Sequence, residues 1–463
     1  MKFDQSKINI LIIISFILSS LLSIYYLDKY DKYSAYQNGN HPMIKIAVKN
    51  HWSEAQIILN DVSEGKKFWR SGKKNTDEFL PQKILALFYI IIGENLEENS
   101  ITKVDNKKIF YLIAKSLFYF FTIYLLSKKL NSFFSKKKIF FVILFLCLIP
   151  DLFQYHSSFW NESLFFSFQI LLIFFYINNN QKIINNIFIG IIIAFMYSVS
   201  SEFFLYIFFI TFVYIINFRV NSFKPLLCIL IGYTLILGLI FTSNNLKDSE
   251  EKVLTYGIKS ALYIYLTPHI VSKRNNISMN ESFLKLKNEG KAWLQKNKIE
   301  YYGESNLLFK IEDVEKHEMY LNYIFKKSIT TIFQNPIITI QHVFRKSFHT
   351  ITLNPLYINY FYEYSGRGEF LKTDIHKKLI PIRIIYSIII YLIVLIGFLK
   401  FIKKKNNNLN IFLIISILYV ILSLGWFGNP RYFTPALIFM SIYFGNFFGA
   451  RNDSLYKIKK FNT

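Results

Sequence analysis

Residues 138–178 read KIFFVILFLCLIPDLFQYHSSFWNESLFFSFQILLIFFYIN. Two apolar runs, 138–155 and 160–178, flank a short polar break around His156. Each run is long enough to cross the hydrocarbon core of a bilayer as a helix, the conformation that satisfies its backbone hydrogen bonds within itself. The stretch therefore predicts two neighbouring transmembrane helices.

The whole chain shares the apolar character of this stretch. Hydrophobic residues make up 52% of its 463 residues, with 49 Phe and 32 Tyr, and its mean hydropathy is positive. This composition is too apolar for an ordinary soluble domain and is typical of lipid-facing surface. We predict an all-α polytopic membrane protein with about ten transmembrane helices, near 8–27, 108–127, 138–155, 160–178, 184–200, 202–218, 225–242, 381–401, 409–427 and 432–448.

The separation of the fifth and sixth runs decides the topology. Only Ser200, Ser201 and Glu202 interrupt the apolar stretch there, and a single bent segment would reverse every later span. The positive-inside rule tests this choice. With ten spans, the pieces on the side of the N-terminus carry 18 basic and two acidic residues. Loop 28–107 carries 12 basic and 11 acidic residues, and loop 243–379 carries 20 and 14. The asymmetry predicts cytoplasmic termini and two large outer loops.

The formal charge of +24 therefore has a topological origin and gives no reason to expect a nucleic-acid partner. Cys147 and Cys228 both lie inside apolar runs, which supports neither a disulfide framework nor a cysteine metal site. The first span is too long, and too poorly followed by small residues, for a removed signal peptide. We expect a protein of the bacterial inner (plasma) membrane with its active face outside.

The two outer loops are more than linkers. Residues 79–93, FLPQKILALFYIIIG, are too short to span and predict an interfacial or re-entrant helix. Residues 318–353 show helical periodicity broken at Asn335-Pro336, which predicts two amphipathic helices on the outer leaflet. The chain then divides into an N-terminal transmembrane module that includes the first outer loop, a large outer loop, and C-terminal helices with a basic tail, at 1–242 (with 28–107), 243–379 and 380–463.

Carboxylates at membrane depth are costly, so each one marks a candidate functional site. Asp151, Glu162 and Glu202 are the three acids in this position, and all fall at the outer ends of their helices. Arg431 falls at the same level, between the last two spans. Their convergence predicts a polar site at the outer membrane boundary, and a purely interfacial position is the alternative for any one acid. We expect Lys115, inside the second span, to snorkel toward the interface.

Several short stretches follow the order found in one family of membrane enzymes. They are His51-Trp52-Ser53-Glu54-Ala55, the run from Asp61 to Phe68, Phe79-Leu80-Pro81-Gln82-Lys83 leading to Gly93, the run from Trp160 to Phe165, and Arg431-Tyr432-Phe433-Thr434-Pro435. In this order the chain resembles the GT-C glycosyltransferases that use polyprenyl-phosphate sugars, which include protein O-mannosyltransferases and the transferases that add aminoarabinose to lipid A. Each stretch is short and degenerate, but they occur in the family's order along the whole length of the chain.

The resemblance implies transfer of a sugar from a polyprenyl-phosphate donor to a glycan, lipid or protein acceptor at the outer face. It implies an inverting displacement in which a first-loop carboxylate acts as general base. The acidic position of the family falls near Asn50 or His51 here, and neither is a carboxylate. We therefore expect Glu54 first, and Asp61 second, to act as the base.

The resemblance also implies cationic groups around the donor phosphate. Arg431 is the best placed of these, and Lys83, Arg70 and Tyr432 are further candidates. Asp151 and Glu162 are expected to orient the base or to hold a divalent metal ion, with Glu202 as a third supporting acid. No pattern in the sequence specifies a metal site.

Two other functions compete with sugar transfer. A lipid-linked polysaccharide polymerase or ligase would share the many spans and the large loop 243–379, but it would not explain the extended first loop with Pro81. A lipid or glycan transporter would place polar groups along a path through the bilayer and often shows repeated halves. For the first loop itself, the alternative is a solvated helical hairpin in which Glu54, Asp61 and Glu64 only face water.

Overall fold

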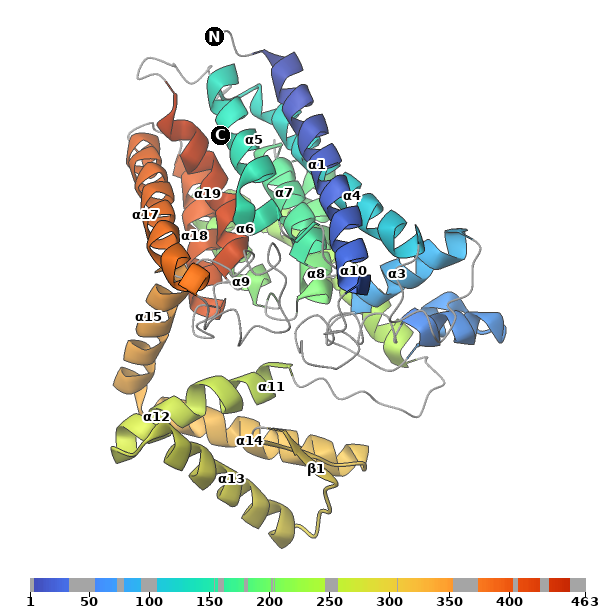
Figure 1. The fold of residues 1–463 in the computed structure, drawn as a ribbon, viewed down its shortest axis with the longest axis vertical. Coiled ribbons are helices and arrows are strands. Elements are labelled where there is room, and N and C mark those ends of the chain that lie inside the picture. Colours follow the sequence, from blue (N-terminus) through green and yellow to red (C-terminus); the bar gives the residue numbers. More distant parts are fainter. Residues whose placement is uncertain are drawn as a thin grey trace.

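The computed structural model describes residues 4–32, 55–72, 79–92, 106–153, 155–156, 162–178, 182–200, 203, 205–245, 257–305, 307–352, 374–402, 407–424 and 433–449. These residues form 17 α-helices and one sheet of two strands, which confirms an all-α architecture. Figure 1 shows a bundle of apolar helices, with a smaller helical domain, α11 to α15, lying against one end of it.

Each of the ten predicted apolar runs overlaps a helix of the bundle. The helices are α1 (Gln5–Lys32), α4 (Asn106–Leu130), α5 (Lys136–Leu148), α7 (Glu162–Ile177), α8 (Ile183–Val199), α9 (Tyr206–Phe218), α10 (Phe223–Asn245), α17 (Asp374–Ile402), α18 (Asn407–Leu424) and α19 (Thr434–Phe447). Four of them, α1, α4, α10 and α17, are long and apolar enough to cross a membrane. The other six have between 13 and 18 residues.

The structure contradicts one predicted helix boundary and confirms another. The single span at 138–155 is wrong, because α5 ends at Leu148 and Pro150 opens the separate short helix α6 (Pro150–Phe153). Proline has no N–H to continue a helix and suits a first turn, so the chain breaks there. The break between the fifth and sixth runs is confirmed, since Ser200 is extended and ends α8 before α9 begins.

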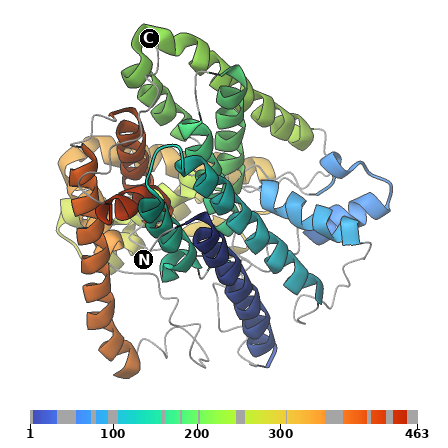
Figure 2. The same ribbon diagram turned by 90° about the horizontal axis from the view of Figure 1, so that it is seen from above.

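Contacts between side chains show how the helices run. In four helix pairs, two contacts near opposite ends give the relative direction of the helices. Gln5–Ser127 and Ser19–Ser116 join α1 and α4, and Phe118–Phe168 and Lys129–Asn178 join α4 to α7 and its last turn. Tyr206–Ser416 and Asn217–Asn408 join α9 and α18, where Asn217 also donates to Tyr176 of α7, and Tyr391–Phe433 and Lys400–Phe447 join α17 and α19. Thus α1 is antiparallel to α4 and α9 to α18, whereas α4 runs parallel to α7 and α17 to α19. Figure 2 shows α1 and α4 lying side by side.

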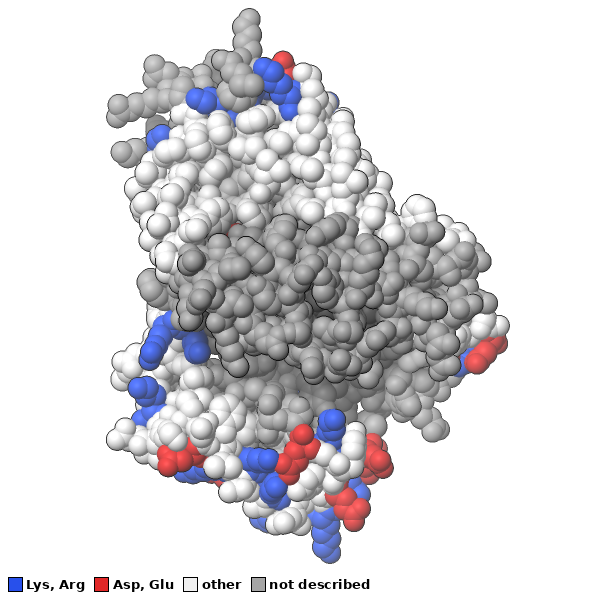
Figure 3. Space-filling model, in the orientation of Figure 1, with Lys and Arg blue, Asp and Glu red and all other residues white. Residues whose placement is uncertain are grey.

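These directions give the bundle two distinct ends. The end where α1 begins also carries Lys128, Lys129, Lys136 and Lys137, and we call it the basic end. The opposite end meets α3 and the domain of α11 to α15, and we call it the loop end (Figure 1). On this face, Figure 3 shows Lys and Arg with one acidic side chain at the top, a white area of described residues below them, and charges of both signs at the bottom.

Glycines let helix backbones approach closely, as is common in membrane helices. A Cβ on Gly190 of α8 would lie 2.0 Å from the Ile229 carbonyl oxygen of α10, and one on Gly232 would lie 2.1 Å from that of Ile187. At the α17–α19 contact, a Cβ on Gly397 would lie 1.9 Å from the Tyr443 carbonyl oxygen. These contacts leave no room for a side chain.

The smaller domain has its own hydrophobic core. It contains α11 (Gly257–Ala261), a π-helical turn (Leu262–Leu266), α12 (Thr267–Asn275), α13 (Met279–Lys296), β1 (Gly303–Ser305), β2 (Leu308–Lys310), α14 (Val314–Gln334) and α15 (Pro336–Thr352). Tyr263, Leu286 and Tyr320 lie at the centre of this core. The two helices predicted within 318–353 are confirmed, and they separate at Asn335. Their packing differs, because α14 buries its apolar face inside the domain.

Charged contacts tie β1 to α13. The Glu304 carboxylate pairs with Lys287 and, at 2.8 Å, with Lys291, one helical turn further along α13. Hydrogen bonds from these two ammonium groups lower the pKa of Glu304 to about 2. Glu304 therefore stabilises the fold in its charged form.

The pH dependence of this contact is testable. Because the pKa of Glu304 is depressed in the folded state, its contribution is complete above the unfolded pKa of about 4.5 and is lost as the pH falls toward about 2. We expect Glu304→Gln to lower the melting temperature at pH 7 and to change it much less at pH 3, measured by thermal unfolding in detergent. The exposed Glu300→Gln is the control and should have little effect at either pH. An equal loss for Glu304→Gln at both pH values would contradict the assignment.

The close helix contacts give a second prediction. We expect Gly397→Ala to lower the free energy of unfolding by about 1–3 kcal/mol, because the new methyl group forces α17 and α19 apart. Gly238→Ala is the matched control, since no atom lies within 4 Å of a Cβ there, and it should be neutral or stabilising by up to about 1 kcal/mol. Thermal stability followed by size-exclusion chromatography distinguishes the two. Equal stability of both variants would show that α17 and α19 are not in this contact.

Candidate functional site

The first loop forms a small folded unit at the loop end. Residues 55–63 are helical, Phe68–Arg70 form a 3₁₀ turn, and Phe79–Ile92 form α3, which confirms the short helix predicted there. Ala55, Ile58 and Leu59 have the spacing of one helix face, and that face is buried. They join side chains of α3 and of the N-terminal part of α4, namely Leu85, Ala86, Tyr89, Tyr111 and Leu112, in one cluster. This face of the first loop is therefore packed on α3 and α4, while Glu64 is exposed as the solvated hairpin would have it.

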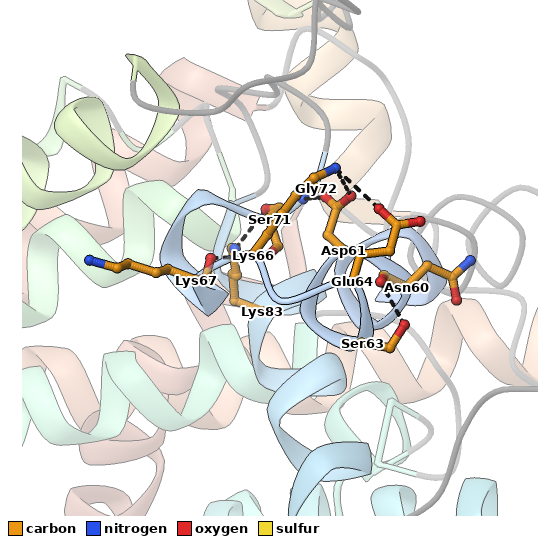
Figure 4. A network of polar contacts seen from close by, with 9 residues as sticks. All are labelled: Asn60, Asp61, Ser63, Glu64, Lys66, Lys67, Ser71, Gly72 and Lys83. Atoms are coloured by element: carbon orange, nitrogen blue, oxygen red, sulfur yellow. Dashed lines mark hydrogen bonds and ion pairs between the residues drawn. The ribbon is translucent and has the colours of Figure 1, made fainter.

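Asp61 holds this unit together. One carboxylate oxygen accepts a hydrogen bond from Lys66 Nζ at 2.7 Å, and the other accepts one from the backbone N–H of Gly72 at 2.6 Å (Figure 4). Gly72 has a positive φ of 88°, and a Cβ there would lie 2.7 Å from Ile58. The Asp61 side chain is only 16% exposed, whereas that of Glu64 is 65% exposed. Both oxygens of Asp61 thus close the turn between the helix at 55–63 and Gly72.

Lys83 binds the same turn from α3. Its side chain is buried, and its ammonium group donates to the carbonyl oxygens of Phe68 and, at 2.8 Å, of Ser71 (Figure 4). The Nζ atom also lies 4.8 Å from the centre of the Phe68 ring. Beside it, Arg70 is half-buried, and its Nε is enclosed without a hydrogen-bond partner among the described residues. Two of the cations predicted to bind phosphate, Lys83 and Arg70, are therefore neighbours.

A second group of polar side chains lies at the same end, between α4 and α7. Lys115 is only 3% exposed and is within electrostatic range of Glu162, so the prediction that it snorkels is wrong. His156 is fully buried, and its Nδ1 lies 2.7 Å from the Ser163 hydroxyl. Its ring packs on Tyr119 with 3.9 Å between the ring centres. The Nε2 atom of His156 is enclosed without a hydrogen-bond partner in the described part of the chain.

Asp151 is the third buried group at this end. It lies on α6, directly after Pro150, and is 3% exposed. The Tyr386 hydroxyl of α17 donates to it at 3.4 Å. Asp151 and Glu162 thus lie in the first turns of α6 and α7 at the loop end, and Asp151 is linked to a helix more than two hundred residues later in the chain.

Helix α4 joins the two groups. Tyr111 and Leu112 belong to the cluster of the first loop, and Lys115 and Ser116 follow one turn later. Lys115 Nζ lies 6.0 Å from the centre of the Tyr111 ring, and the Ser116 hydroxyl donates to the His156 carbonyl oxygen. The loop end thus brings together buried cations, a buried imidazole and buried or half-buried carboxylates. Such an arrangement can bind a charged headgroup and move a proton.

Four of the predicted site residues, Glu54, Glu202, Arg431 and Tyr432, lie outside the described residues. Of the described ones, Asp61, Lys83 and Arg70 lie in the first-loop unit, and Asp151 and Glu162 lie at the bundle's end. Among the residues that the structure describes, no group of three or more His, Cys, Asp and Glu side chains could hold a metal ion. His156 was not among the predicted site residues. Its position between two apolar runs, unusual for an ionisable side chain, was the sequence feature that could have identified it.

Comparison with known proteins adds no identification. No family model matches the sequence, and a search of curated proteins found no similar one.

The hydrogen bonds from Lys83 to the 68–71 turn give a prediction about the stability of that turn. We expect Lys83→Met to leave the Phe68 and Ser71 carbonyls without their donor and to weaken the turn by about 1–3 kcal/mol. Hydrogen–deuterium exchange of peptides covering 55–72 should then accelerate roughly tenfold or more, since 1.4 kcal/mol is a factor of ten, while the bundle stays protected. The control is Lys67→Met, whose side chain is exposed. Unchanged exchange in Lys83→Met would show that Lys83 does not hold this turn.

Proposed function

We propose that this chain is an integral membrane glycosyltransferase that transfers a sugar from a polyprenyl-phosphate donor to a lipid, glycan or protein acceptor at the loop end. One observation carries the proposal. Lys83, Lys115, Asp151 and His156 are buried, and all lie at the end of an apolar bundle that also holds the first-loop unit. Ionisable groups in such surroundings are costly and usually serve function. The reaction class rests on the resemblance described above.

The proposed topology has ten membrane crossings with both termini in the cytoplasm. The alternating helix directions and the basic residues at one end support it. The six shorter helices are accommodated by neighbours that cover their ends and by local thinning of the bilayer. In a bacterium this places the loop end at the outer face of the inner (plasma) membrane.

The proposed reaction is a single displacement at the anomeric carbon. An acceptor hydroxyl attacks that carbon, the bond from the carbon to the phosphate oxygen breaks, and the polyprenyl phosphate leaves with the bonding electrons. A carboxylate takes the hydroxyl proton, and the anomeric configuration inverts. Glu54 is the proposed base, because both oxygens of Asp61 already accept hydrogen bonds within the loop.

The leaving phosphate needs positive charge around it. Arg431 and Tyr432 are proposed to bind it together with Arg70, whose Nε has no partner among the described residues. Lys83 is proposed to act at short range by its charge and by holding the 68–71 turn. Asp151, Glu162 and Glu202 are proposed to orient the base or to take part in holding a divalent cation. The hydrocarbon tail of the donor would lie among lipid-facing helices, which suits a site at the bilayer edge.

The reaction itself is testable with purified protein in lipid. We expect release of polyprenyl phosphate from one member of a panel of polyprenyl-phosphate sugars when a glycan acceptor is present. Glu54→Gln should lower turnover by about 10²–10⁴-fold with little change in donor binding, as expected for loss of a general base. Arg431→Ala should weaken both donor binding and turnover. Glu300→Gln, in the smaller domain, is the control and should keep the turnover of the unchanged protein.

The outcomes separate the competing functions. If Asp61→Asn abolishes turnover while the fold persists and Glu54→Gln does not, the reaction class stands but the base is Asp61. If folded protein releases nothing from any donor, while it extends lipid-linked glycans or moves them across vesicles, sugar transfer from polyprenyl phosphate is wrong. A polymerase or ligase, or a transporter, then takes its place.

A further inference from the structure

One face of α15 is apolar and uncovered. Phe333 at the end of α14 and Ile337, Ile340 and Phe344 on α15 are 77%, 70%, 55% and 67% exposed. Their spacing of three or four residues places those on α15 along a single face. The apolar helix α17 of the bundle also carries exposed side chains of this size. The stripe differs because it belongs to the smaller domain outside the bundle. A contiguous exposed apolar stripe marks an interaction site.

The opposite face of α15 is fixed by packing. Ile338 and Val343 pack on Leu266 and Ile270 of the neighbouring helix segment. His342 lies against His269 of α12, with 4.2 Å between the ring centres. The helix is therefore held with its stripe turned away from the domain.

Positive charge lies on one flank of the stripe. Within 336–352 there is no Asp or Glu, and Arg345 lies about 100° around the helix from Phe344, whereas Lys346 lies about 100° further, toward the packed His342. Lys273 and Arg274 end the adjacent α12, and Arg274 donates to Gln334 at 3.4 Å, next to the start of α15. Burial, His269 and the two cations Lys346 and Arg345 lower the pKa of His342 to about 4, so at neutral pH the positive charge comes from lysine and arginine.

The stripe also lies next to the apolar surface of the bundle. α15 contacts α18, and α17 lies above the upper end of α15 at the left of Figure 1. Large exposed apolar side chains continue along α17, among them Ile382, Ile385, Ile388 and Ile389. An apolar stripe with a basic flank at this position fits a membrane surface, where side chains enter between headgroups and cations bind lipid phosphates.

We propose that α15 binds the lipid surface at the loop end, with Phe333, Ile337, Ile340 and Phe344 among the headgroups and Arg345 and its basic neighbours on anionic lipid phosphates. A second copy of the chain fits less well. Three side chains on α15 and one at the end of α14 cover far less than the roughly 800 Å² per partner of a standard protein interface. A lipid surface needs no matching shape, and its anionic phosphates match the basic flank.

Nitroxide labels test the proposal on the full chain in vesicles that contain anionic lipid. One label is attached at Phe344→Cys and a control label at Tyr302→Cys, which is 66% exposed beside the sheet of the same domain. The native Cys147 and Cys228 are buried. We expect the label at 344 to collide several-fold more with oxygen, which partitions into lipid, and several-fold less with a water-soluble nickel chelate than the label at 302. Equal accessibility at both positions would overturn the proposal.

A label at 344 that is shielded from both reagents would also overturn it, because protein and not lipid would then cover the stripe.

A second variant tests the proposed contact between Arg345 and lipid phosphates. Arg345→Glu, with the label at 344, should raise nickel accessibility about threefold in anionic vesicles and much less in zwitterionic ones. No change in anionic vesicles would exclude a role for lipid phosphate. Both measurements are independent of enzymatic activity, so they can fail while the proposed function stands.

Discussion

The cost of placing an ionisable group among apolar helices is the constraint on which this structure depends. Most of the bundle avoids that cost, since its core consists of aliphatic and aromatic side chains. Among the described residues, Lys115, Asp151 and His156 are buried at the loop end, and Lys138 is buried at the basic end. Each of the three at the loop end contacts or faces a polar group from another element, so the polar region there is built by several helices together.

Broken helices and short loops make that end possible. Pro150 stops α5 and starts α6, which carries Asp151 inward, and the chain then turns through His156 before Glu162 opens α7. A continuous helix would instead separate Asp151 and Glu162 by about three turns along its axis. The first-loop unit covers the adjacent end of α4, and the contact of Lys83 with two carbonyl oxygens keeps its turn closed. The polar groups are therefore enclosed by protein.

The domain of α11 to α15 is attached to the bundle without sharing its core. Its capping box at Ser278 and Glu281 and its own cluster around Tyr263 make it a separate folding element of the loop. Among the described helices, α15 is packed on this domain and also contacts α18. A helix in that position joins the domain to the loop end of the bundle.

Local sequence determined where the helices lie. The apolar runs, the short helix after Pro81 and the break at Asn335-Pro336 all follow from hydropathy, helical spacing and proline chemistry, which act over a few residues. Only the tertiary structure decided what each polar group does. Lys115 is buried because α7 packs beside it, and Asp61 is engaged because the chain returns through Gly72. The difference between the buried face of α14 and the open face of α15 is likewise set by distant segments. Burial and pairing depend on neighbours far along the chain, and helical periodicity contains no information about them.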